Sequence, residues 1–161
     1  MTTIALPNPM DVREMFEGLL GRDVELAPGE PVVPTATERA SVGLYVDDTM
    51  SLAAAVAADL SLTAFAGAAM GLVPAAAAAD MITEGFVSPA VWENFAELLN
   101  IGASLLNHDG APHVRLYESS EPGVLPANDV GVLLRELGGR IDLVMTIHGY
   151  GSGHLSVVRA H

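Results

Sequence analysis

The segment VREMFEGLLG at positions 12–21 is repeated in pattern by VWENFAELLN at positions 91–100. Both copies read V-x-E-x-F-x-x-L-L, in which apolar residues recur at the spacing of an amphipathic helix. An internal repeat of this kind predicts a protein built from two similar halves. The segments that come after each copy along the chain then decide the expected architecture.

Each copy is succeeded by apolar, partly alternating segments that are typical of strands and end at turn residues. After the first copy, strands are expected at 23–26, 41–46 and 51–57, the last two forming a hairpin around Asp47-Asp48. After the second copy, they are expected at 113–117, 141–147 and 154–158, with a short helix at 128–136. Each half is therefore a helix, a strand and a hairpin. We predict one α+β domain over residues 1–161, with helices packed on an antiparallel sheet.

The halves are expected to cover about 11–58 and 90–161, joined by Ala-rich helices at 59–87. Within that connection, 60–79 is uncharged but is interrupted by Pro74 and has no basic flank. We therefore expect a buried helix, a turn at 71–74 and a second Ala-rich turn of helix, and no membrane span. The N-terminus lacks the basic and apolar regions of a secretory signal, which favours a cytoplasmic protein. The segment 28–38, rich in Pro, Thr and Glu, is expected to be a mobile loop.

Composition and charge exclude several classes of function. The 161 residues include 20 acidic and 7 basic side chains, and all seven basic ones are Arg, for a net charge of −13. Such a chain repels phosphate backbones and anionic lipids, so we expect neither nucleic acid nor a membrane as partner. The absence of Lys excludes a P-loop lysine and Schiff-base chemistry. The absence of Cys excludes disulfides, thiolate nucleophiles and Cys-zinc sites.

A helix predicted at 89–107 carries the most distinctive polar pattern. Ser88 and Pro89 are typical of a helix start, and the segment 107–110 contains the residues of a helix stop. At 100° per residue the polar side chains form one narrow stripe. Outside it the residues are apolar or small, and Asn94 is the exception. The stripe holds Glu93, Glu97, Asn100 and Ser104.

Two interpretations of this stripe remain open on the helix alone. It is the ordinary solvent-facing side of a surface helix, or it is a functional site. Like charges four residues apart are mildly unfavourable, and Asn is a poor residue for a helix interior. The second interpretation explains why such residues gather there.

Glu97-x-x-Asn100, followed by Ile101-Gly102-Ala103, resembles the E-x-x-N helix of the CheC/CheX/FliY chemotaxis phosphatases. Glu93 stands where that family has Asp or Ser, and Pro122 lies near the place of the family's later proline. The resemblance covers most of the chain, because the family is also built from two helix-plus-hairpin halves. The first half here has glycines at the corresponding positions, so the single motif is closer to the CheX arrangement.

The resemblance implies an aspartyl-phosphate phosphatase that acts on a phosphorylated, CheY-like response regulator in two-component signalling. Asn100 would hold the attacking water in line with phosphorus, and Glu97 would pair with a lysine of the regulator. Glu93 and Ser104 would contribute to docking. No cofactor is implied in this chain, since Mg²⁺ would belong to the regulator. The resemblance and the apolar content also favour a homodimer.

Two other classes of function stay open. The first is a non-catalytic interaction module of the same fold, in which the stripe only docks a partner. The second is a small-molecule or metal sensor at His148 and His154, which flank a glycine-rich turn and could face each other. That turn, GYGSG at 149–153, resembles a phosphate cradle, but strands are expected on both sides, which favours a flexible hairpin tip. Two histidines without a third ligand make a weak metal site, so none is assigned.

Overall fold

The fold was determined as a computed structural model that describes residues 4–161; the first three residues of the predicted domain lie outside this range. The helices in chain order are α1 (Pro9–Leu20), α2 (Leu60–Met70), α3 (Ala75–Glu84), α4 (Pro89–Ile101), the 3₁₀ helix η1 (Gly102–Leu106) and α5 (Asn128–Leu134). The strands are β1 (Val24–Pro28), β2 (Ala40–Asp47), β3 (Leu52–Asp59), β4 (Val114–Ser120), β5 (Arg140–Ile147) and β6 (Gly151–Arg159). The predicted α+β fold with helices on an antiparallel sheet is confirmed.

The six strands form one antiparallel sheet in the order β1-β5-β6-β3-β2-β4. This order is symmetric about the boundary between β6 and β3, where Val56 lies opposite Val157. The two hairpins therefore meet at the centre of the sheet. The first strand of each half pairs with the hairpin of the other half, β1 with β5 and β4 with β2. The edge strand beside each hairpin therefore comes from the other half of the chain.

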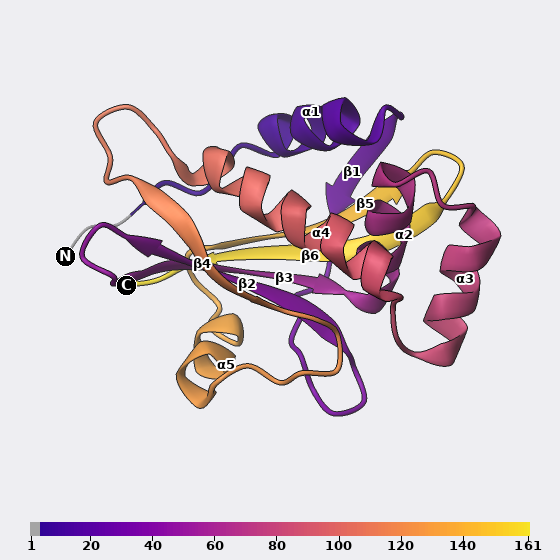
Figure 1. Cartoon of the computed structure of the whole chain (residues 1–161). Coiled ribbons are helices and arrows are strands. Elements are labelled where there is room, and N and C mark those ends of the chain that lie inside the picture. The colour runs from indigo at the N-terminus through magenta and orange to yellow at the C-terminus, as the bar shows by residue number, and fades with distance from the viewer. Residues whose placement is uncertain (1–3) are drawn as a thin grey trace.

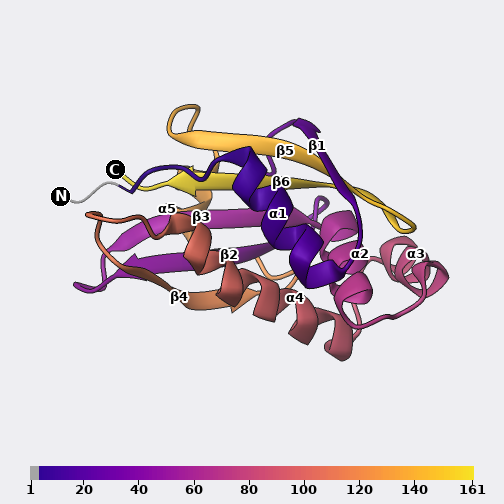
Figure 2. The same ribbon diagram turned by 90° about the horizontal axis from the view of Figure 1, so that it is seen from above.

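The sheet is covered on both faces, as Figure 1 shows. Helices α1, α2 and α4 lie on one face, α5 lies on the other, and α3 packs against α2 at the end of the sheet (Figures 1 and 2). Strand β3 is buried on both sides: Ala54 and Ala58 belong to the core under the large helices, and Ala55 and Ala57 to the core under α5. Successive side chains of a strand point to opposite faces, so this central strand needs small apolar residues throughout.

The glycine-rich turn has a packing role that its sequence did not reveal. Gly151 and Gly153 lie within β6 and not in the hairpin tip, which corrects the expected extent of the tip. A Cβ atom on Gly153 would lie 2.4 Å from the backbone nitrogen of Leu62, and one on Gly151 would lie 2.7 Å from the ring of Phe65. These glycines therefore let α2 approach β6 closely.

The uncharged connection forms two separate helices, as expected. Helix α2 is buried around most of its surface, and α3 begins after the turn at 71–74. Among the described residues, no helix combines the length and the apolarity needed to cross a membrane.

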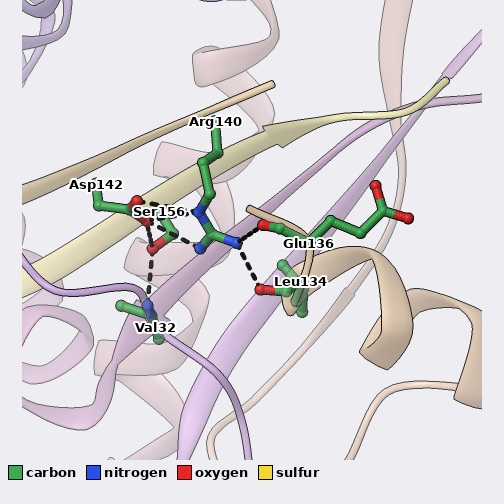
Figure 3. Close-up of polar contacts among 6 residues, drawn as sticks. All are labelled: Val32, Leu134, Glu136, Arg140, Asp142 and Ser156. Atoms are coloured by element: carbon green, nitrogen blue, oxygen red, sulfur yellow. Dashed lines mark hydrogen bonds and ion pairs between the residues drawn. The ribbon is translucent and has the colours of Figure 1, made fainter. Parts of the chain in front are cut away.

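On the face that carries α5, a polar network joins four parts of the chain (Figure 3). Arg140 donates hydrogen bonds to both carboxylate oxygens of Asp142 at 2.9–3.1 Å, and Ser156 Oγ donates to Asp142 Oδ1 at 2.6 Å. The backbone nitrogen of Val32 donates to Ser156 Oγ at 2.8 Å, and Val32 is buried. The segment 28–38, expected to be a mobile loop, is therefore anchored at Val32.

Candidate functional site

Helix α4 is fixed at its start by the residues that the sequence indicated. Ser88 Oγ accepts a hydrogen bond from the Val91 backbone nitrogen at 3.3 Å, and Pro89 occupies the first turn. Val91, Phe95, Leu98 and Leu99 are buried. The helix ends at Ile101 and continues as η1, so the single helix predicted at 89–107 is in fact an α-helix followed by a 3₁₀ helix.

The four residues of the predicted stripe are all exposed. Glu93, Glu97 and Asn100 lie on α4, and Ser104 lies on η1. A 3₁₀ helix winds more tightly than an α-helix, by about 20° more per residue, so Ser104 is turned away from the line of the other three. The first three residues therefore form the continuous part of the stripe.

The polar groups of this stripe are available to a partner. Within the described chain, no hydrogen bond or ion pair is found for the side chains of Glu93, Glu97 or Asn100. The segment 89–107 contains no basic residue, so the two carboxylates give the stripe a negative charge. The Asn100 amide can both donate and accept hydrogen bonds, whereas ionised Glu97 only accepts them. The arrangement is suited to a cationic group beside a bound water.

The side of α4 next to the stripe is held by α2. Asn94 Nδ2 donates to the Gly67 carbonyl oxygen at 3.0 Å, which pairs a polar residue that the helical pattern left unexplained. A Cβ on Gly67 would lie 2.4 Å from the Val91 carbonyl oxygen, so the two helices cross in close contact. Sequence reasoning did not find this anchor. Gly67 and Gly71, four residues apart on a buried helix, were the available signal.

A second anchor reaches α4 from the sheet. Tyr45 on β2 donates its hydroxyl to the Leu99 carbonyl oxygen at 2.6 Å, next to Asn100. Burial raises the pKa of Tyr45 well above its usual value, so the hydroxyl remains a donor at neutral pH. No sequence signal links these two residues, because they lie in different halves of the chain.

Replacing Tyr45 by Phe is expected to lower the free energy of unfolding by about 1–2 kcal/mol, because the Leu99 carbonyl loses its buried donor. Urea unfolding followed by circular dichroism measures this change.

The same variant has an expected pH signature. The folded state keeps the Tyr45 proton at a pH where the unfolded chain loses it, so this group makes stability fall as pH rises above about 10. Tyr45→Phe should show a smaller alkaline loss of stability than the wild type. An unchanged alkaline slope would contradict the assigned role of burial.

Helix α1 does not reproduce the stripe. Glu14 and Gly18 are exposed at the positions that correspond to Glu93 and Glu97. The other carboxylate of this region, Glu17, accepts a hydrogen bond from the Val24 backbone nitrogen at 3.1 Å and lies 3.6 Å from Arg13. The carboxylate–amide pair is therefore confined to the second repeat, as the sequence indicated.

The two histidines of the β5–β6 hairpin do not face each other. His154 Nδ1 lies 3.0 Å from Asp59 Oδ2, whereas exposed His148 lies at the tip, where its carbonyl accepts from Arg22 at 3.3 Å. The possibility that they face each other is therefore wrong. In the described part of the chain, no three His, Asp or Glu side chains gather as metal ligands would.

Comparisons with known proteins show the fold alone. No protein-family model and no curated protein sequence matches this chain. Solved structures do match. The FliM middle domain from H. pylori has a TM-score of 0.59 at 8% identity, over 93% of this chain and 83% of that chain.

Complexes are also among the matching structures. The CheX–CheY–BeF3–Mg complex from Borrelia burgdorferi has a TM-score of 0.55 at 10% identity, over 92% of both chains. The FliG–FliM complex from H. pylori has a TM-score of 0.53 at 9% identity, over 92% of this chain and 84% of that chain. The chain thus has the fold common to CheX and the FliM middle domain. The sequence resemblance implied the CheX fold, and the likeness to FliM comes from the structure.

Proposed function

We propose that this protein is a CheX-like phosphatase that hydrolyses the aspartyl phosphate of a phosphorylated response regulator. The observation that supports it is the placement of Glu97 and Asn100. Both are exposed on one stripe of a helix that is anchored on its other sides. The fold is the one in which CheX is solved with CheY, BeF3 and Mg²⁺.

In this proposal Asn100 positions the attacking water. Its amide oxygen accepts a hydrogen bond from water, while its NH₂ group donates to an oxygen of the phosphoryl group. Holding water in line with phosphorus supplies much of the catalysis in phosphoryl transfer, which needs little covalent chemistry from the protein. The water then attacks phosphorus, the bond to the regulator's aspartate breaks, and inorganic phosphate leaves.

Glu97 sets the register between the two proteins. Its carboxylate pairs with a lysine beside the phosphorylated aspartate of the regulator, in a charge-assisted hydrogen bond. Glu93 and Ser104 extend the docking surface along α4 and η1. Mg²⁺ is assigned to the regulator, where it neutralises charge on the phosphoryl oxygens.

The test is the dephosphorylation rate of a CheY-like regulator from the same cell, charged with acetyl phosphate. Wild-type protein should accelerate the loss of phosphate. Asn100→Ala should lower kcat/KM on the order of 100-fold, the usual cost of removing one catalytic hydrogen-bonding group. Glu14→Ala is the control, because Glu14 on α1 is the exposed counterpart of Glu93 and lies outside the candidate site. Equal rates with wild type and Asn100→Ala would refute the assignment of Asn100.

A second candidate is a non-catalytic interaction module, favoured by the equally good fit to FliM, which is also solved bound to FliG. In that case the regulator or another partner binds to α4 and no acceleration is seen with wild-type protein. Binding measured by isothermal titration, beside the rate assay, separates the two candidates.

A further inference from the structure

Helix α2 ends in a backbone arrangement that normally requires glycine. The Val73 nitrogen donates to the Ala68 carbonyl at 2.8 Å, and the Leu72 nitrogen donates to the Ala69 carbonyl at 3.3 Å. These two bonds define a Schellman motif in which Leu72 holds the left-handed position. Its φ angle is 58°, a conformation that is unfavourable for a bulky side chain.

The neighbouring glycine does not occupy this position. Gly71 has a φ of −95°, which any residue can adopt. A Cβ there would lie 2.4 Å from Asn94 Nδ2, so a larger residue would displace the Asn94 amide. The chain therefore has glycine where α4 approaches α2, and leucine at the strained position next to it.

The Leu72 side chain itself does little to offset this strain within the described chain. The Leu72 side chain is 78% exposed, so it contributes little to the core. A strained backbone position is retained when the residue has a use that outweighs its cost, and such positions gather at functional sites. Because the Leu72 side chain is apolar and exposed, we infer that this use is contact with another molecule.

The turn that carries Leu72 is rigid. Tyr150 donates its hydroxyl to the Val73 carbonyl at 2.6 Å, and the Arg22 guanidinium stacks over the Tyr150 ring at 4.7 Å from its centre. Pro74 then leads into α3. A partner that contacts Leu72 would not have to order this turn, which lowers the entropic cost of binding.

The turn also lies beside the candidate site. Gly71 touches Asn94, which is three residues before Glu97 on α4. Packed helices have axes 8–10 Å apart. A standard interface buries about 800 Å² on each partner, which corresponds to a disc of about 16 Å radius. A regulator docked on Glu97 and Asn100 would reach Leu72 if its footprint extends over α2.

We propose that Leu72 is an apolar anchor that binds the regulator beside the Glu97–Asn100 site. It would enter an apolar depression next to the lysine and the phosphorylated aspartate. This inference depends on the proposed function for the identity of the partner. Leu72 sets affinity for the regulator and takes no part in the chemistry.

The test is Leu72→Gly, which removes the side chain and relieves the backbone strain together. Its melting temperature should equal or exceed that of the wild type. Burial of one leucine corresponds to roughly a tenfold or larger change in affinity, so KM and Kd for the phosphorylated regulator should rise at least tenfold with kcat retained. Leu72→Met keeps an apolar side chain and should stay close to wild type.

Leu137→Gly is the matched control, because Leu137 is an exposed leucine (92%) between α5 and β5. This substitution should leave KM and Kd unchanged. KM and Kd within twofold of wild type for Leu72→Gly would overturn the proposal. If the wild type binds the regulator without accelerating dephosphorylation, the phosphatase function fails while the Kd ratio still decides the role of Leu72. Absence of binding by the wild type overturns both.

Discussion

Replacing Asp142 by alanine is expected to lower the free energy of unfolding by about 3–5 kcal/mol, the usual cost of leaving a buried charge without its partner. The side chains of Arg140 and Asp142 are only 6% and 16% exposed. Two nitrogens of Arg140, Nε and Nη2, donate only to Asp142 (Figure 3). Without that carboxylate they would remain buried and unpaired.

The loss should spread to neighbouring segments of the same face. Ser156, which holds the Val32 nitrogen, also depends on Asp142 as its acceptor. The remaining nitrogen of Arg140 donates to the carbonyls of Leu134 and Glu136 at 2.7 Å, where α5 ends. We therefore expect faster amide hydrogen exchange near Val32 and α5. Helix α4, on the opposite face, should keep its exchange rates.

Urea unfolding of the wild type and Asp142→Ala measures the effect. Asp80→Ala, an exposed carboxylate on α3, is the control and should change stability by less than about 0.5 kcal/mol. The double variant Arg140→Met/Asp142→Leu removes both charges and should be more stable than Asp142→Ala. A loss below about 1 kcal/mol in Asp142→Ala would show that water or another group satisfies Arg140.

Gly67→Ala is expected to lower the free energy of unfolding by about 1–3 kcal/mol and to disturb the candidate site as well. The added Cβ would meet the Val91 carbonyl oxygen at 2.4 Å and Val91 Cγ1 at 2.8 Å. A backbone atom cannot rotate away, so α4 must move relative to α2. The hydrogen bond from Asn94 to Gly67 would weaken with that movement. Regulator dephosphorylation should therefore fall together with stability.

Gly18→Ala provides a control of opposite sign. Gly18 lies in the exposed interior of α1, and a Cβ there meets nothing within 4 Å. Alanine should therefore raise stability by about 0.5–1 kcal/mol through its better helix propensity. Thermal unfolding of the two variants in parallel gives the comparison. Equal effects of both substitutions would refute close contact between α2 and α4.

Much of the candidate site was predictable from local pattern. The spacing of apolar residues on α4 correctly placed Glu93, Glu97 and Asn100 on an exposed stripe, because burial on a helix follows its period of 3.6 residues. Ser88 likewise marked the start of the helix. The predicted end of this helix was wrong, because the α-helix ends at Ile101 and η1 follows directly. Near this end the Leu99 carbonyl accepts a hydrogen bond from Tyr45, which is distant in sequence.

The glycine-rich segment and its flanking histidines show where local pattern misleads. GYGSG is typical of a flexible tip. Gly153 is needed for another reason: α2, which is distant in sequence, packs so closely that a Cβ would meet its backbone. His148 and His154 are close in sequence, but strand pairing places His154 against Asp59 of β3. Sequence distance contains no information on which strands become neighbours.

The order of helices and strands and the exposed face of α4 follow from the sequence alone, since they depend on interactions between residues a few positions apart. Strand order is different. Pairing β1 with β5 and β4 with β2 exchanges the edge strands between the two halves, which no local pattern records. The Arg140–Asp142 network, the Tyr45 and Asn94 anchors and the strain at Leu72 likewise arise only when distant segments pack together, because burial and steric contact are properties of the assembled chain.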